Sequence, residues 1–211
     1  MIAVLDYGIG NLRSAEKALQ HVGADARLVD TAAAAERATG VVLPGVGAFG
    51  ACARALRESG LEEIVRLTIS ESRPFLGICV GLQLLFESSE EDPDEPGLGI
   101  LAGTVRSIPA GERRPQMQWN IVRQVGGTRS RLLGDDPSQW YYFVHSYSPA
   151  PKGADATAAV VGTCDYGGEI PVVFERGNLF GTQFHPEKSA SAGLRLLERF
   201  ARLCAARAVE A

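Results

Sequence analysis

The chain has 211 residues, of which 45% are hydrophobic and 22% charged, and its formal net charge is −4. This composition is typical of a globular domain with one core, and the acidic balance argues against a nucleic-acid-binding surface, which is normally basic. The first apolar run stops at Asp6 with no basic segment before it, so no signal peptide is expected. No apolar run approaches the ~18 residues of a membrane span. The sequence therefore predicts a single domain over residues 1–211, located in the cytoplasm and away from membranes.

Cysteine usage fits a reducing compartment. None of the four cysteines forms a C-x-x-C pair, and the chain has three histidines, so no zinc pattern is present. A chain of this length needs no disulfide framework. Three cysteines are expected to be buried thiols, since free cysteine behaves as a small hydrophobic residue: Cys52, Cys164 and Cys204. The fourth, Cys79, is considered below.

Strands and helices alternate in the first half of the chain. Asn11 is expected to cap the first helix. The alternation predicts an α/β fold, with a mostly parallel central sheet covered by helices. Short apolar runs predict strands at residues 2–5, 26–29, 40–43 and 75–78, and amphipathic patterns predict helices at 12–22, 30–38, 51–71 and 81–86.

The second half has a different pattern. An acidic, proline-rich tract at 90–97 predicts a surface loop, and an amphipathic pattern predicts a final helix over 192–209. Between them lie strand-like pieces without obvious helices, which we expect to be antiparallel strands and hairpins added to the sheet. These pieces are residues 104–108, 140–145, 158–161, 172–174 and 179–184.

The stretch FLGICVGLQLLF places Cys79 where an expected strand runs into an expected helix, between Gly77 and Gly81. A strand–turn–helix of this kind lifts the central side chain to the carboxyl edge of the sheet, as in a nucleophile elbow with cysteine in place of serine. A helix N-terminus favours a thiolate, and its N–H groups can bind an oxyanion. The motif predicts a nucleophilic cysteine, with a structural cysteine as the alternative.

A nucleophilic cysteine needs a base, and the base needs an orienting group. His21 ends the first expected helix and is expected to be solvated, and His145 is either structural or part of a site wall. His185 follows a strand in GTQFHPEKS, and Glu187 lies two residues further on. In an extended chain these two side chains point the same way, so Glu187 can hydrogen-bond His185. The predicted catalytic set is Cys79, His185 and Glu187.

Together, GICVGLQ and QFHPEKS resemble the class-I, or triad, glutamine amidotransferases. Four further segments resemble one branch of that class, the glutaminase subunits of imidazole glycerol phosphate synthases in histidine biosynthesis. These segments are LDYGIGNLRS, LPGVGAFG, PQMQWN and YYFVHSY. One departure is Gln118, where the branch usually has glycine, which leaves the backbone geometry there open.

The resemblance implies a class-I glutamine amidotransferase fold, of flavodoxin-like type, and hydrolysis of L-glutamine to glutamate and ammonia through a cysteinyl thioester. It implies oxyanion donors after Cys79 and in the Pro44–Gly47 loop, and substrate contacts at Gln83, Ser146 and Tyr147. Without the resemblance, Gln83 would be interpreted as an exposed helix residue and Tyr147 as a core aromatic residue. The expected substrate-binding residues are Gly45, Val46, Gly47, Val80, Gln83, Ser146 and Tyr147.

A free-standing glutaminase would waste its ammonia, and this chain has neither room for a second catalytic domain nor a G-x-x-x-x-G-K-[ST] nucleotide loop. The resemblance implies that the acceptor is a separate (β/α)₈-barrel cyclase, which forms a heterodimer with the glutaminase and makes imidazole glycerol phosphate and AICAR. Asn11 is expected at the partner contact because the first turn leaves the carboxyl end of the first strand, at the same edge as Cys79. The resemblance implies a second contact at Trp119, a core position being the alternative. No metal or organic cofactor is implied.

Three other interpretations stay open from the sequence. The first is the glutaminase of a different synthase, against which the four branch-specific segments argue. The second is a stand-alone cysteine hydrolase of similar fold, which activity on peptides without activity on glutamine would favour. The third is a non-catalytic binding protein, and labelling of Cys79 by a glutamine-like electrophile would exclude it.

Overall fold

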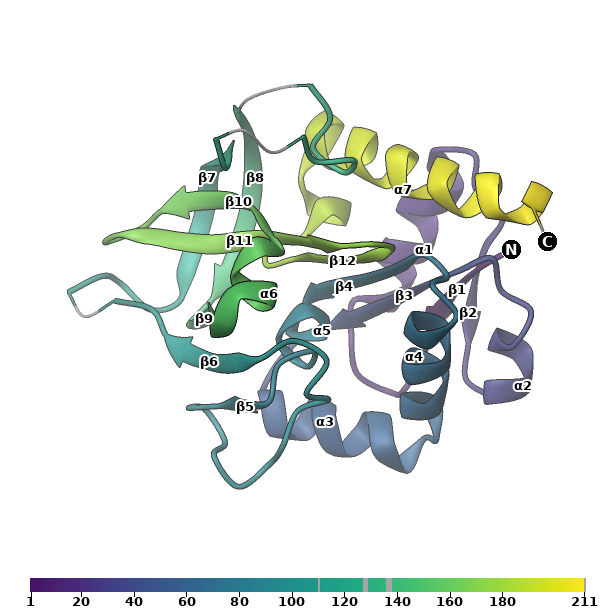
Figure 1. Cartoon of the computed structure of the whole chain (residues 1–211), viewed down its shortest axis with the longest axis horizontal. Helices are drawn as coiled ribbons and strands as arrows, with labels where there is room; N and C mark the ends of the chain where they lie inside the picture. Colours follow the sequence, from purple (N-terminus) through teal and green to yellow (C-terminus); the bar gives the residue numbers. More distant parts are fainter. Residues whose placement is uncertain (110, 127–128, 136–137, 211) are drawn as a thin grey trace.

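The computed structural model describes residues 1–109, 111–126, 129–135 and 138–210, and confirms the expected α/β architecture (Figure 1). Within these residues the main sheet has nine strands in the order β2-β1-β3-β4-β12-β11-β10-β7-β8. The first five run parallel, and the last four pair antiparallel with their neighbours. In chain order the strands are β1 (Ile2–Leu5), β2 (Ala26–Val29), β3 (Gly40–Gly45), β4 (Phe75–Cys79), β7 (Gln116–Gln124), β8 (Ser138–His145), β10 (Val160–Asp165), β11 (Glu169–Arg176) and β12 (Leu179–Thr182).

Helices cover both faces of the parallel part of the sheet. In Figure 1, α1 (Leu12–His21) and α7 (Ala190–Glu210) lie on one face, and α3 (Phe49–Glu58) and α4 (Leu61–Ser70) lie on the other. The parallel strands are buried almost throughout because both faces are covered. Shorter helical segments are α2 (Ala32–Ala35), α5 (Val80–Gln83), α6 (Gly153–Ala158) and the 3₁₀ turn η1 (Pro186–Lys188).

The C-terminal half corrects two expectations about strand pairing. The strand expected at 104–108 does not join the main sheet: β6 (Gly103–Ser107) forms a separate small sheet with β5 (Ser88–Ser89) and β9 (Tyr147–Pro151). β12 is not simply an added antiparallel strand either, since it runs parallel to β4 and antiparallel only to β11. This pairing places the residues that follow β12 at the same sheet edge as Cys79, where β4 ends.

Several element bounds also differ from expectation. The helix expected over 51–71 is split, because Gly60 takes a left-handed φ of +73° between α3 and α4. The helices expected at 30–38 and 81–86 shrink to α2 and α5, of four residues each. β7 was not expected, because its polar residues interrupt the apolar pattern, and residues 153–158 before β10 form α6.

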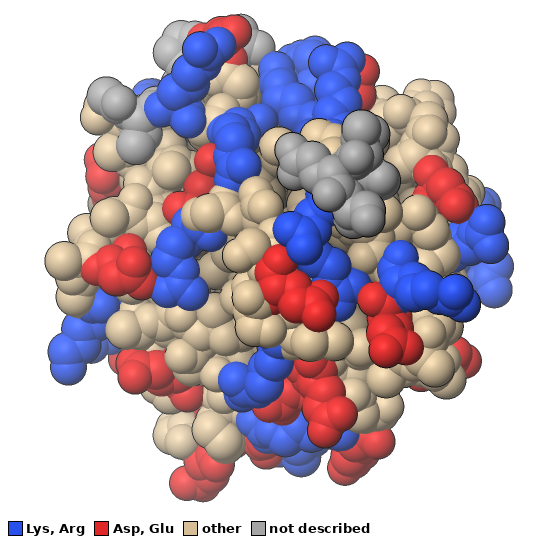
Figure 2. Space-filling model, turned by 45° about the vertical axis from the view of Figure 1, so that its right-hand side comes forward, with Lys and Arg blue, Asp and Glu red and all other residues tan. Residues whose placement is uncertain are grey.

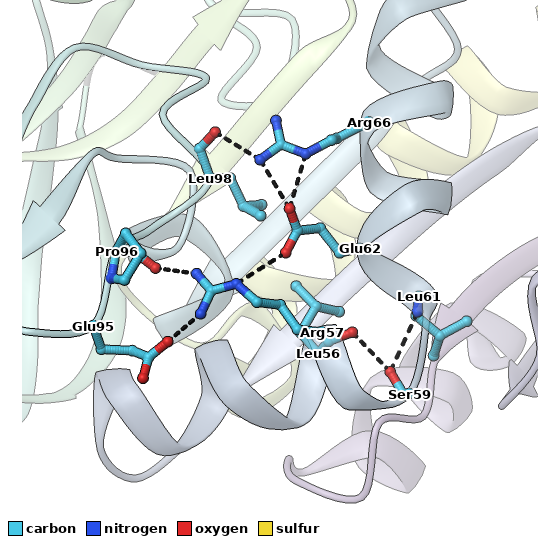
Figure 3. Close-up of polar contacts among 9 residues, drawn as sticks. All are labelled: Leu56, Arg57, Ser59, Leu61, Glu62, Arg66, Glu95, Pro96 and Leu98. Atoms are coloured by element: carbon cyan, nitrogen blue, oxygen red, sulfur yellow. Dashed lines mark hydrogen bonds and ion pairs between the residues drawn. The ribbon is translucent and has the colours of Figure 1, made fainter.

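The acidic tract is tied to α3 and α4 by charged side chains (Figure 3). Arg57 donates to the carboxylate of Glu95 and to the carbonyl of Pro96, and its Nε lies 3.3 Å from Glu62. Arg66 also pairs with Glu62, at 2.9 Å, and donates to the carbonyl of Leu98 at 3.1 Å. We call Arg57, Glu62, Arg66 and Glu95 the loop clamp. It holds an expected surface loop in a defined path across the two helices.

Charges of both signs are interspersed over most of the face drawn in Figure 2, and a group of basic side chains lies at its top. Within the described residues, no helix combines the length and apolar character needed to cross a bilayer.

Candidate active site

Cys79 lies at a strained turn at the carboxyl edge of the sheet. It is the last residue of β4, has φ +55° and ψ −112°, and is followed directly by α5. A positive φ is uncommon for a residue other than glycine and marks a position that the surroundings must hold. A Cβ on Gly77 would come within 2.7 Å of the Gly81 carbonyl oxygen, and one on Gly81 within 1.9 Å of the Leu43 carbonyl oxygen. The two glycines therefore allow the backbones of β3, β4 and α5 to pack together and present the sulfur at the edge.

His185 and Glu187 form a buried pair next to this edge. His185 Nδ1 lies 2.8 Å from Glu187 Oε1, and both side chains are 2% exposed. The expected contact is present, but its expected cause was wrong, because Glu187 lies in the 3₁₀ turn η1 rather than in extended chain. Asn11 occupies the N-cap position of α1 without making a side-chain capping bond, and its amide instead lies 3.4 Å from Glu187 Oε1. The other carboxylate oxygen, Oε2, has no hydrogen-bond partner among the described residues.

Electrostatics favour the protonated form of His185. Burial alone would lower its pKa, but hydrogen bonding to Cys79, followed by hydrogen bonding to Glu187, outweighs burial and raises the pKa to about 10. Nδ1 is engaged by Glu187, which leaves Nε2 to exchange a proton at the site. A protonated imidazole beside Cys79 is suited to stabilise a thiolate and to donate a proton to a leaving amine.

A cavity of about 220 Å³ opens over Cys79 and His185. It brings together most of the residues expected to bind substrate. Gly45 does not line it, because this residue packs behind the loop, where a Cβ would meet the Gly81 nitrogen at 2.7 Å. The expected residues that line the cavity are Val46, Gly47, Cys79, Val80, Gln83, Ser146, Tyr147 and His185. His145, for which a place in a site wall was one of two alternatives, lines it too, and the lining residues that had not been expected are Glu91, Pro115 and Val144.

Two buried side chains donate hydrogen bonds to the glycine-rich segment Pro44–Gly47 at the end of β3. Tyr7 donates its hydroxyl to the Pro44 carbonyl at 2.7 Å, and the Cys52 thiol donates to the Val46 carbonyl at 3.2 Å. Burial raises the pKa of both side chains above their ordinary values, so both remain donors near neutral pH. Both carbonyls thus accept hydrogen bonds from buried donors, which fix the path of the loop. Gly47, with φ +83°, completes the turn of the loop.

Glu91 connects the acidic tract to the site. Its Oε2 accepts a hydrogen bond from the Phe49 backbone N–H at 2.8 Å, at the start of α3, while the side chain also lines the cavity. The sequence concealed this role, because Glu91 belongs to a run of acidic residues that is typical of a solvated loop. In the sequence, only its position shortly after the Cys79 turn could have indicated this role.

The environment of Gln83 contradicts one of its two earlier interpretations, an exposed helix residue. The residue is 3% exposed, so it is not an exposed helix residue. Its Nε2 donates to the Tyr147 carbonyl at 3.0 Å and to Gln183 Oε1 at 3.1 Å. Because these bonds engage both amide protons, only its carbonyl oxygen can accept a bond from a ligand in the cavity. Tyr147 is half-buried and lines the cavity, so it is not a core aromatic residue.

His145 is buried and uncharged near neutral pH, because desolvation lowers its pKa to about 4. Its ring lies between the Tyr147 carbonyl and the Gln116 side chain, with a separation of 2.8 Å on each side. Both alternatives from the sequence therefore apply: His145 supports the structure and also lines the cavity.

The two residues expected at a partner interface lie on the same side of the molecule as the site. Trp119 is 44% exposed on β7 and makes an edge contact with Tyr142, so a core position is wrong. The Tyr142 carbonyl in turn accepts the backbone N–H of His185 at 3.1 Å. Gln118 is exposed in the same regular strand and has no left-handed φ, so the position requires no glycine.

Potential metal ligands do not gather at this site. Within the described ranges, no group of three or more His, Cys, Asp or Glu side chains is arranged to hold a metal ion. All four cysteines are buried free thiols, as expected for Cys52, Cys164 and Cys204.

Comparisons with known proteins agree with one another. The family model for class-I glutamine amidotransferases matches residues 3–203. A protein of Acinetobacter baylyi named imidazole glycerol phosphate synthase subunit HisH is 46% identical, with 94% of this chain and 96% of the relative covered. Proteins of the same name from Rhodopirellula baltica and Salinibacter ruber are 44% and 46% identical, with 95% and 96% of this chain and 97% and 94% of the relatives covered.

Solved structures agree on the fold. A crystal structure of a glutamine amidotransferase superposes with a TM-score of 0.75 at 25% identity, with 97% of this chain and 98% of that chain covered. The structure of PurLQS from Thermotoga maritima superposes with a TM-score of 0.72 at 18% identity, with 97% of this chain and 97% of that chain covered. At that identity the second likeness concerns the fold alone.

Proposed function

The chain belongs to the class-I glutamine amidotransferase family and is the glutaminase subunit of an imidazole glycerol phosphate synthase, and from this premise we propose how its residues act. The proposed catalytic set is Cys79, His185 and Glu187. One observation carries the proposal: the strained Cys79 and His185, which Glu187 holds, meet in one cavity at the carboxyl edge of the sheet. Open α/β sheets bind ligands at this edge.

The reaction begins when the Cys79 sulfur attacks the side-chain amide carbon of L-glutamine. The C–S bond forms while the oxyanion is met by backbone N–H groups of Val80 and of the loop at Val46 and Gly47. His185 Nε2 donates a proton to the nitrogen, the C–N bond breaks, and ammonia leaves. Water then attacks the thioester with His185 as base, the C–S bond breaks, and glutamate is released with the sulfur regenerated.

The cavity wall supplies contacts that orient the substrate. The Glu91 carboxylate is a suitable partner for the substrate α-ammonium group, since a charge-assisted hydrogen bond fixes both position and charge. Gln83 contributes its carbonyl oxygen, and Ser146 and the neighbouring Tyr147 contribute further parts of the lining. Gly45 supports the loop from behind rather than contacting the substrate.

The ammonia acceptor is proposed to be a separate cyclase subunit, with this chain as its partner in a heterodimer. The relatives' name describes one subunit of a synthase. The proposed contact surface includes Asn11 and Trp119, which lie beside the Glu187 side of the site. We also propose that residues 1–211 form one glutamine amidotransferase domain, supported by the family match over residues 3–203, and that the protein works in the cytoplasm without an organic cofactor.

The deciding experiment measures glutamate release from glutamine with the chain alone, with a cyclase subunit, and with that subunit in the presence of its nucleotide ligand. We expect weak activity alone and a strong rise in the full mixture, because ammonia released without an acceptor is wasted and the glycines of the Pro44–Gly47 loop allow its peptides to rearrange when the partner docks. Cys79→Ala is the matched control. It should abolish glutamine-dependent synthesis and leave synthesis from added ammonium intact.

Full activity of the isolated chain would contradict the requirement for the partner. Loss of ammonium-dependent synthesis in Cys79→Ala would contradict the division of labour between two chains. Activity on peptides with none on glutamine would identify a stand-alone cysteine hydrolase instead.

A further inference from the structure

The catalytic sulfur has a neutral hydrogen-bond donor in addition to His185. Gln183 lies directly after β12 and is fully buried, and its Nε2 lies 3.6 Å from Cys79 Sγ. This separation is ordinary for an N–H group that donates to sulfur. Gln183 does not line the cavity, so it approaches the sulfur from the protein side rather than from the substrate side.

The orientation of this amide follows from a chain of contacts that begins at a backbone carbonyl. The Tyr147 carbonyl can only accept, so the Gln83 nitrogen must face it, at 3.0 Å. The same Gln83 nitrogen then donates to Gln183 Oε1 at 3.1 Å. The Gln183 side-chain oxygen therefore faces Gln83, and its nitrogen must face Cys79.

We propose that Gln183 is a catalytic residue whose Nε2–H stabilises the Cys79 sulfur as a thiolate, and that Gln83 is the positioning residue that sets the polarity of this donor. The inference rests on the proposed glutaminase function and deepens it. The donor acts twice in the reaction. It stabilises the attacking thiolate before the C–S bond forms, and it stabilises the same thiolate as the leaving group when water cleaves the thioester.

A neutral donor suits this position physically. A hydrogen bond to a charged acceptor contributes more than one between neutral groups. A lysine or arginine placed there would bring a second buried cation beside the protonated His185. An amide held by Gln83 stabilises the negative sulfur without adding a charge.

The test replaces this N–H group with an oxygen of the same shape. In Gln183→Glu, one carboxylate oxygen can still accept from Gln83, and the other faces the sulfur and repels a thiolate. We expect the pH midpoint for alkylation of Cys79 by iodoacetamide, located on its peptide by mass spectrometry, to rise by about one pH unit or more. We expect kcat for glutamate release to fall roughly 10- to 100-fold, with KM for glutamine unchanged, because Gln183 does not line the cavity.

Two further variants separate this role from a purely structural one. Gln183→Met removes the donor at similar size without adding charge, and it should shift the alkylation midpoint in the same direction by a smaller amount. Gln20→Glu makes the same chemical change on α1, where Nε2 donates to the Ala26 carbonyl far from the site. It should alter neither the midpoint nor kcat.

If Gln183→Glu does not fold, Gln183→Met and Gln83→Leu carry the test through the alkylation profile, and both midpoints should rise. Unchanged midpoints and unchanged kcat in folded Gln183 variants would overturn the proposal, provided that the parent protein releases glutamate. Absence of glutamate release from the parent protein with its cyclase subunit would instead overturn the proposed function.

Discussion

Two groups of charged side chains in this protein hold a carboxylate, one fully buried and the other partly exposed to water. The pair His185–Glu187 lies at the carboxyl edge of the sheet with both side chains 2% exposed. In the loop clamp, by contrast, Arg57 and Glu95 keep 34% and 15% of their side-chain surfaces exposed. Water can replace a lost partner in the clamp but not in the buried pair. The difference indicates that the buried pair governs chemistry, whereas the clamp serves mainly to hold the tract that carries Glu91.

We expect the largest loss of glutamate release from substitutions in the buried pair. His185→Ala removes the proton carrier, and glutamate release should fall on the order of 10³-fold or more. Glu187→Gln keeps a hydrogen-bonding group but loses the negative charge, so the loss should be smaller, roughly 10- to 100-fold. Steady-state rates with the cyclase subunit present measure both. Equal and complete losses would show that Glu187 has another role, such as a role in folding.

The buried pair should also leave a signature in the pH dependence of stability. The folded pKa of His185, about 10, lies above its unfolded value near 6.5, so its stabilising contribution is fully present below about pH 6.5 and is lost as the pH rises toward 10. Glu187→Gln removes part of the cause of this shift. The fall in unfolding free energy over this window should therefore be shallower in the variant.

Urea denaturation at a series of pH values measures this slope in the parent and in Glu187→Gln. Buried thiols such as Cys52 contribute equally to both proteins, so the difference between the two slopes isolates the pair. Identical slopes would mean that Glu187 does not raise the His185 pKa.

A third prediction concerns two exposed apolar residues, one near the buried pair and one near the loop clamp. Trp119 lies on β7 near the buried pair, and Leu67, 39% exposed, lies on α4 near the clamp. Trp119→Ala should weaken association with the cyclase subunit by about 2 kcal/mol or more, because aromatic residues concentrate binding energy at interface centres. Leu67→Ala should leave association unchanged.

Titration calorimetry, together with melting of the isolated variants, measures these effects. Unfolding of Trp119→Ala, or unchanged binding, would place the partner surface elsewhere.

The smallest effect should come from the loop clamp. Arg57→Ala removes contacts with Glu62, Glu95 and the Pro96 carbonyl, yet partly exposed ion pairs contribute little, so the free energy of unfolding should fall by less than about 1 kcal/mol. Arg66 still holds the tract through Leu98. KM for glutamine should rise modestly if the clamp positions Glu91. A large fall in stability, measured by urea denaturation, would show that the clamp resembles the buried pair.

Patterns local to the chain were enough to predict the strands β1 to β4 and the candidate chemistry. Apolar runs such as residues 2–5 and 75–78 become buried strands because helices cover both faces of the sheet. The spacing of Gly77, Cys79 and Gly81 predicted the elbow, because only small neighbours allow the backbones to approach so closely. The family followed from short motifs, since these carry the residue types that the chemistry needs.

How the remaining parts of the chain meet depends on tertiary contacts. The parallel pairing of β12 with β4 depends on contacts between distant segments, and it places Gln183 and His185 beside Cys79. The tract with Glu91 looks like a solvated loop in sequence, and folding alone turns one of its carboxylates into the cavity. Hydrogen-bond polarity is likewise a three-dimensional property: Gln183 presents its N–H to the sulfur because Gln83, one hundred positions away in the chain, occupies its oxygen.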